Sequence, residues 1–121
     1  MQLATASYGA WSRRQGMGFP VACSLLLPGW LPEAQDFPRC WAITPRFSWW
    51  REPWPERFWV HYRAQLETYG VPRIAEILHK IGAEQERIVL LCHESDPSQC
   101  HRSLFAGWWM TQTGEVVEEL T

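Results

Sequence analysis

The sequence predicts a small three-layer α/β fold, in which a mainly parallel sheet of about four strands is covered by helices. Two apolar runs, residues 20–27 and 87–92, have the continuous hydrophobic character of strands that are buried on both faces. Two helical patterns separate these runs, and a third follows the second run. Strands that alternate with helices in this way pair in parallel, because each crossover returns the chain to the same edge of the sheet.

The first third of the chain supplies the first two strands. Residues 2–8 are small or β-compatible and end at Gly9, so we expect a strand there. Residues 10–19 contain two glycines and two arginines and are typical of a loop. The second strand is expected over residues 20–27, where Pro28-Gly29 closes the apolar run.

The middle of the chain begins irregularly and then turns helical. Residues 28–57 are rich in proline and predict no regular element beyond a short extended piece at residues 41–44. From residue 56 to 69, apolar side chains recur at steps of three and four, and Gly70 is the expected C-cap. A second helix is expected over residues 71–81 for the same reason.

The last third contains the strongest strand pattern, residues 87–92. Asp96 is placed to cap a helix, with Pro97 at its first position and Gln99 completing a capping box. We expect that helix to run to about Thr111 and to end at Gly114. Residues 116–120 predict a final strand at an edge of the sheet.

Composition indicates one globular domain over residues 1–121. The formal net charge is −2, which gives no general attraction to nucleic acid or to a membrane surface. No segment approaches the roughly 18 apolar residues of a membrane span, and the N-terminus lacks the pattern of a secretory signal. We therefore expect a cytoplasmic protein that makes no membrane contact. Its thiols are then expected to be reduced; they are Cys23, Cys40, Cys92 and Cys100.

A cluster of reactive residue types follows the third strand. Cys92 ends that strand, and Cys100-His101-Arg102 lie at the start of the next helix, with Glu94 in the loop between them. Ligands of open α/β sheets bind beyond the carboxyl ends of the strands. We therefore predict that these five side chains converge to form the catalytic site.

One interpretation makes Cys92 a nucleophile. A thiol near a helix N-terminus and an arginine is expected to have a lowered pKa. A strand-end cysteine followed by an arginine is typical of phosphatase and rhodanese loops, although Cys92 and Arg102 lie too far apart in sequence for that motif.

A second interpretation is a site for a divalent metal such as zinc, with Cys92, Cys100 and His101 as ligands and Glu94 as a candidate fourth. Against it, the neighbours Cys100 and His101 would point about 100° apart if both were helical. The sequence leaves zinc and no cofactor at all both open.

A third interpretation is non-covalent binding of an anionic ligand by Arg102 and the helix N-terminus, with Glu94 accepting hydrogen bonds. The simplest alternative is that the cysteines only pack, while Glu94 and Arg102 form an ordinary ion pair.

These residues resemble the signature of the domain of unknown function 488 proteins, a cysteine-x-glutamate followed by a short loop and a cysteine-histidine-arginine on a helix. The resemblance is carried by Cys92-His93-Glu94, Asp96-Pro97, Cys100-His101-Arg102, Leu104, Ala106 and Gly114. Ser7-Tyr8 resembles the family's N-terminal element more weakly. The resemblance implies a Rossmann-like fold with this motif as its active site, and it supplies no reaction.

One departure from the family concerns the second strand. Members often carry an arginine there, whereas this chain has Val21-Ala22-Cys23-Ser24. If that arginine binds a substrate anion, this protein either uses another one, such as Arg13, Arg14 or Arg46, or has lost the activity.

A second candidate surface lies between Trp41 and Arg63, where five tryptophans alternate with arginines. Aromatic faces stack on bases and arginines neutralise phosphates, so a nucleotide or nucleic acid is one expected ligand. Tryptophan and arginine are also preferred anchors of protein interfaces. The candidate ligand-binding residues are Ser7, Tyr8, Arg13, Arg46, Trp49 and Trp50.

Two functional hypotheses follow. In the first, the protein is an enzyme or a ligand-binding protein that acts on a nucleotide, a nucleic acid or another anionic substrate at the Cys/Glu/Cys-His-Arg site. In the second, it is a non-catalytic module that engages a protein partner through its Trp/Arg-rich surface.

Overall fold

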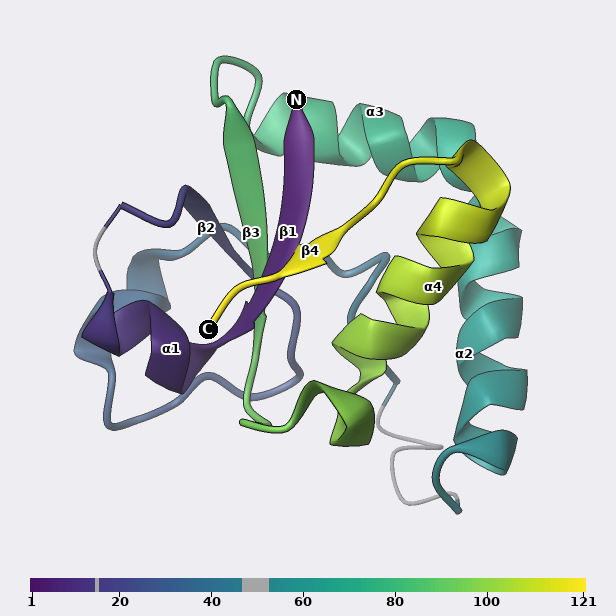
Figure 1. Ribbon diagram of the computed structural model, residues 1–121, viewed down its shortest axis with the longest axis horizontal. Coiled ribbons are helices and arrows are strands. Elements are labelled where there is room, and N and C mark those ends of the chain that lie inside the picture. The colour runs from purple at the N-terminus through teal and green to yellow at the C-terminus, as the bar shows by residue number, and fades with distance from the viewer. Residues whose placement is uncertain (15, 47–52) are drawn as a thin grey trace.

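The computed structural model describes residues 1–14, 16–46 and 53–121, and these form an α/β fold with a four-stranded parallel sheet (Figure 1). The strands are β1 (Gln2–Ser7), β2 (Phe19–Ala22), β3 (Arg87–Cys92) and β4 (Glu118–Glu119). The α-helices within the described residues are α1 (Tyr8–Arg13), α2 (Glu56–Tyr69), α3 (Val71–Ile81) and α4 (His101–Thr113). The predicted fold class is confirmed. Each of the described helices is too short or too polar to cross a bilayer.

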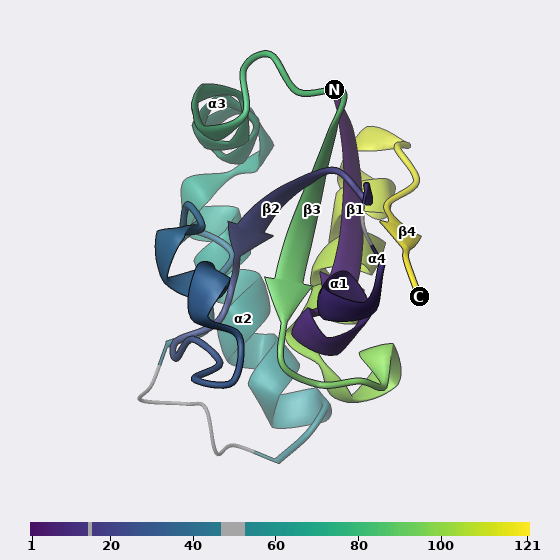
Figure 2. The same cartoon turned by 90° about the vertical axis from the view of Figure 1, so that its left-hand side faces the viewer.

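The strands lie in the order β2-β3-β1-β4, which Figure 2 shows from the side. β3 occupies the centre and pairs with β1 over its whole length, from Arg87 opposite Gln2 to Cys92 opposite Ser7. β4 is a short edge strand that pairs with β1. Since every strand pair is parallel, all carboxyl ends meet at one edge of the sheet.

The alternation of side chains along the strands builds a separate core on each face. Ile88, Leu90 and Cys92 of β3 pack on one face against residues of α2, α3 and α4. Val89 and Leu91 pack on the opposite face against residues of α1 and of the 3-10 helix η1 (Pro32–Asp36). The fold is therefore three-layered, as predicted.

The helices α2 and α3 have the predicted bounds. Gly70 ends α2 with φ 79° and donates its N–H to Leu66, a backbone conformation that is rare for other residues. Pro72 then lies in the first turn of α3. Backbone N–H groups in the first turn have no acceptor within the helix, so the missing N–H of proline costs no hydrogen bond there. The two helices meet at a steep angle in Figure 1.

Three predictions near the N-terminal half are wrong. Residues 10–13 belong to the helix α1, because Ser7 caps it by accepting a hydrogen bond from the N–H of Ala10. β2 ends at Ala22 and not near residue 27, since the chain bends at residues 24–26, where the carbonyls of Ser24 and Leu25 accept hydrogen bonds from the Arg39 side chain. Residues 41–44 form turns and not an extended piece.

The helix start predicted at Asp96 is also wrong. Asp96 caps the short 3-10 helix η3 (Pro97–Gln99), where it accepts hydrogen bonds from the N–H and hydroxyl of Ser98. These donors lower the pKa of Asp96. Cys100 is extended, with φ −131° and ψ 146°, and α4 begins only at His101. The predicted end at Gly114 is confirmed.

Candidate functional site

The candidate site lies where the two central strands end. The chain leaves β1 into α1, on one face of the sheet, and leaves β3 toward α4, on the other face. The connections diverge between the carboxyl ends of these neighbouring strands, which is where open α/β sheets bind ligands. Cys92 and its sheet partner Ser7 occupy this position.

Because the backbone of Cys100 is extended, the side chain of Cys100 points toward the imidazole of His101. Two successive helical residues would point apart, which was the objection to a shared site. Because Cys100 precedes the first helical residue, its sulfur lies 3.8 Å from Nδ1 of His101. The Sγ of Cys92 lies 3.2 Å from Nε2 on the other side of the ring.

The backbone fixes the orientation of the imidazole. Nε2 of His101 lies 2.7 Å from the carbonyl oxygen of Cys23, which can only accept a hydrogen bond. The proton therefore resides on Nε2, and Nδ1 presents its lone pair toward Cys100. The ring also packs edge-on against Tyr62, at 5.6 Å between centroids.

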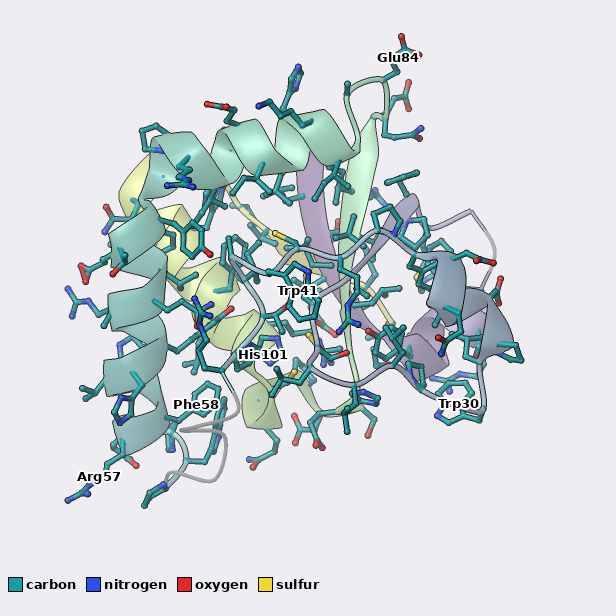
Figure 3. The ribbon with its side chains drawn as sticks, turned by 180° about the vertical axis from the view of Figure 1, so that it is seen from behind. Trp30, Trp41, Arg57, Phe58, Glu84 and His101 are labelled. Carbon is teal, nitrogen blue, oxygen red and sulfur yellow. The ribbon has the colours of Figure 1, made fainter. Side chains whose placement is uncertain are left out.

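The cluster is buried. Cys92, Cys100 and His101 expose 1%, 4% and 9% of their surfaces. His101 lies inside the molecule in Figure 3, whereas Arg57 and Glu84 project from its surface. All four cysteines are unpaired and buried.

The two thiols of the cluster differ in their electrostatics. Burial raises the pKa of Cys92 well above its usual range, so the expected lowering at this residue is wrong. The hydrogen bond from Cys92 lowers the pKa of Cys100. The negative charge of the pair therefore belongs on Cys100, at the N-terminal end of α4.

This geometry suits two kinds of chemistry. Cys92, Cys100 and His101 each offer one ligand atom, and these atoms lie within 4.8 Å of one another. Thiolate and imidazole are preferred zinc ligands, whose donor atoms lie roughly 3.5 Å apart in a tetrahedral site. The Cys100–His101 contact also suits a thiol nucleophile beside a base.

The structure places Arg102 away from this cluster. Its guanidinium is 1% exposed and forms a forked pair with the carboxylate of Glu119 on β4, at 2.9 and 3.0 Å. Its remaining nitrogen donates to the carbonyl oxygen of Glu94 at 2.6 Å. Burial works against its charge, but Glu119 together with Cys100 and Cys92 outweighs burial and raises the pKa of Arg102.

Glu94 contributes its backbone and not its carboxylate to these contacts, and its side chain is exposed. Of the five residues predicted to converge, the structure thus brings together Cys92, Cys100 and His101, and it places the charged groups of Glu94 and Arg102 elsewhere.

Of the other candidate ligand-binding residues, Ser7 and Tyr8 lie at the end of β1 beside Cys92. Ser7 caps α1, and the buried Tyr8 hydroxyl bonds to Ser24 at 2.7 Å. Arg13 and Arg46 are exposed. Trp49 and Trp50 lie outside the described residues.

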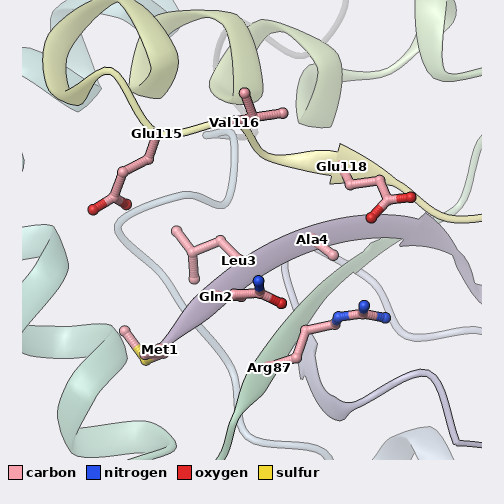
Figure 4. Close-up of a pocket in the computed structure, with 8 residues that line it drawn as sticks. All are labelled: Met1, Gln2, Leu3, Ala4, Arg87, Glu115, Val116 and Glu118. Atoms are coloured by element: carbon pink, nitrogen blue, oxygen red, sulfur yellow. The ribbon is translucent and has the colours of Figure 1, made fainter.

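A hollow of about 420 Å³ lies near the amino ends of the strands, at the end of the sheet opposite the candidate site (Figure 4). Its lining comes from the amino ends of β1 and β3 and from the segment after α4, and it includes Arg87, Glu115 and Glu118. It contains neither a cysteine nor a histidine and is separate from the cluster at Cys92.

Sequence reasoning missed two groups that shape the site. The carbonyl of Cys23 orients His101, and a backbone acceptor leaves no signal in a sequence. Glu119 neutralises Arg102 from the far end of the chain. One of several glutamates in this C-terminal segment offers no local clue to such a partner, although a buried arginine requires one.

The comparisons with known proteins give one match. The family model for "Domain of unknown function DUF488" matches residues 41–109, which is more than half of the 121-residue chain. The match includes Cys92, Cys100 and His101. No curated protein and no solved structure matches the chain.

Proposed function

This chain belongs to the family described as "Domain of unknown function DUF488", and we propose that it is a metal-dependent enzyme or ligand-binding protein in which Cys92, Cys100 and His101 hold a divalent ion such as zinc.

The observation that carries this proposal is the convergence of three soft ligands in a buried place. An uncompensated thiolate is costly to bury, and a bound cation removes that cost. The hydrogen bond from His101 to the Cys23 carbonyl supports the proposal further. Metal-binding histidines almost always donate one ring nitrogen in this way, which fixes the orientation of the ring.

Three protein ligands leave one position of a tetrahedral ion open, as in catalytic zinc sites. A bound ion would supply a Lewis-acid position for an oxyanion or a polarised water. The proposed substrate is therefore anionic, such as a nucleotide or nucleic acid phosphate. The chain's own part is to hold the two cysteines and one oriented imidazole together at the end of β3.

Cobalt binding tests the proposal, because thiolate ligands give Co²⁺ an intense charge-transfer absorption. The chelator-treated protein should bind one Co²⁺ with this signature, and Zn²⁺ should displace it. Cys92→Ser, Cys100→Ser and His101→Gln should each weaken binding by at least about tenfold, since each removes a ligand.

Cys40→Ser is the matched control, because Cys40 is equally buried but lies outside the ligand group. It should leave cobalt affinity unchanged. Absence of cobalt binding by the wild-type protein would refute the proposal. If Cys100 then reacted rapidly with an alkylating reagent, a nucleophile interpretation with Cys100 in the role first given to Cys92 would replace it.

The protein-interaction alternative is favoured by exposed tryptophans. Trp30 and Trp41 are 61% and 54% exposed, and Arg39 stacks over Trp41 at 4.2 Å. Stacked aromatic and arginine side chains are common anchors in interfaces. This function would not depend on the cluster, so metal removal would leave partner binding intact.

A further inference from the structure

We infer that Arg102 and Glu119 are positioning residues that couple the C-terminal strand β4 to the metal site, and that Arg102 does not bind the ligand. The inference rests on the proposed function, because it concerns the shape of the same site.

The first step is that each of the three guanidinium nitrogens of Arg102 already donates a hydrogen bond within the protein. Nε and Nη2 donate to the two carboxylate oxygens of Glu119, and Nη1 donates to the Glu94 carbonyl. Such a forked arginine–carboxylate pair restricts both side chains to one geometry. With 1% of its surface exposed, Arg102 has no face turned toward an external anion.

The second step is the position of these contacts in the chain. Arg102 directly follows His101 in the first turn of α4. Glu94 lies in the loop that joins Cys92 to Cys100. The Arg102 guanidinium therefore holds the start of this loop against the first turn of α4. This contact helps to set the orientation of Cys92 and Cys100 relative to His101.

The third step is that β4 depends on the same pair. β4 has only two residues, and it is held to β1 by the Leu120 N–H bonded to the Thr5 carbonyl. The Glu119 carboxylate adds a hydrogen bond from the Thr5 hydroxyl at 2.8 Å besides its pair with Arg102. Docking of β4 and placement of Arg102 therefore support one another.

Coupling of this kind is reciprocal. If docked β4 favours the metal-binding geometry, then bound metal must favour docked β4. Amide hydrogen exchange of residues 117–120 in the wild-type protein should therefore slow when Zn²⁺ is added. No change in their exchange on saturation with Zn²⁺ would overturn the inference.

The variant Glu119→Gln removes the charge of the pair and keeps the side-chain shape. We expect it to weaken Zn²⁺ affinity about tenfold or more, as is typical when a group supporting a metal ligand is lost. Its Co²⁺ spectrum should also shift, because the cysteines would take a different geometry. A merely structural role would lower thermal stability without moving the spectrum of the folded protein.

Glu118→Gln is the matched control, since Glu118 is the exposed neighbour on the same strand. It should leave affinity and spectrum unchanged. If Glu119→Gln binds Zn²⁺ with wild-type affinity and spectrum, the inference fails while the proposed function stands. If the wild-type protein binds no Co²⁺ at all, the proposed function itself has failed.

Discussion

Tyr62 shows how single side chains around the cluster are constrained. Its ring is fully buried against His101, and its hydroxyl donates to the Ile43 carbonyl at 2.5 Å. Burial raises the pKa of Tyr62 well above its usual range, so the hydroxyl keeps its proton and remains a donor.

Tyr62→Phe should therefore destabilise the protein, because it removes the Tyr62 donor to the buried Ile43 carbonyl while the ring packing is kept. We expect a loss of about 1–2 kcal/mol in the free energy of unfolding, measured by urea denaturation. Tyr69→Phe, on the half-buried end of the same helix, is the control and should change stability little. An equal loss in both variants would mean that the Ile43 contact contributes nothing specific.

At the residue scale, the sequence indicates which side chains matter but not what they contact. Cys92, Cys100 and His101 stand out by residue type and by position after a buried strand. The pairing of Arg102 with Glu119 could not be predicted, because it joins residues that approach only through the order of strands in the sheet. The lower pKa at Cys100 was missed because it depends on which thiol donates to the other.

At the scale of elements, the sequence predicts the ends of a helix correctly where glycine or proline residues mark them. α2 and α3 have the predicted bounds because glycine and proline define their ends. The start of α4 was misjudged because Asp96 and Pro97 do form a helical start, but of a 3-10 turn that stops at Cys100. This break shapes the candidate site, since it turns Cys100 toward His101.

Replacing Gly107 within α4 or its C-cap Gly114 by alanine is expected to change the stability of the protein in opposite directions. Gly114 ends the helix in the left-handed region, at φ 78°, where any side chain is strained. Gly114→Ala should therefore cost about 1 kcal/mol. Gly107 lies within the helix beside open space, so Gly107→Ala should stabilise the protein by about 0.5–1 kcal/mol.

Thermal denaturation of the two variants beside the wild type measures this difference. Both changes add one methyl group to the same helix, so each is the control for the other. If the melting temperatures of both variants shifted in the same direction, then the C-cap conformation of Gly114 and the helix propensity at Gly107 would not explain the stability changes.

At the scale of the whole molecule, the fold class could be predicted because strand and helix patterns alternate along the chain. The strand order could not, because it depends on pairings between distant segments. That order is what makes the site: β1 and β3 are neighbours whose connections leave on opposite faces, which places Cys92 at their point of divergence. The Cys23 carbonyl reaches His101 because β2 lies beside β3.

The most direct measurement is X-ray absorption at the zinc edge of the wild-type protein loaded with one equivalent of Zn²⁺. The proposed site predicts sulfur neighbours at about 2.3 Å and a histidine nitrogen at about 2.0–2.1 Å from the ion. Cys92 and Cys100 account for the sulfur and His101 for the nitrogen. A spectrum with only oxygen and nitrogen neighbours would contradict a zinc site at these three residues.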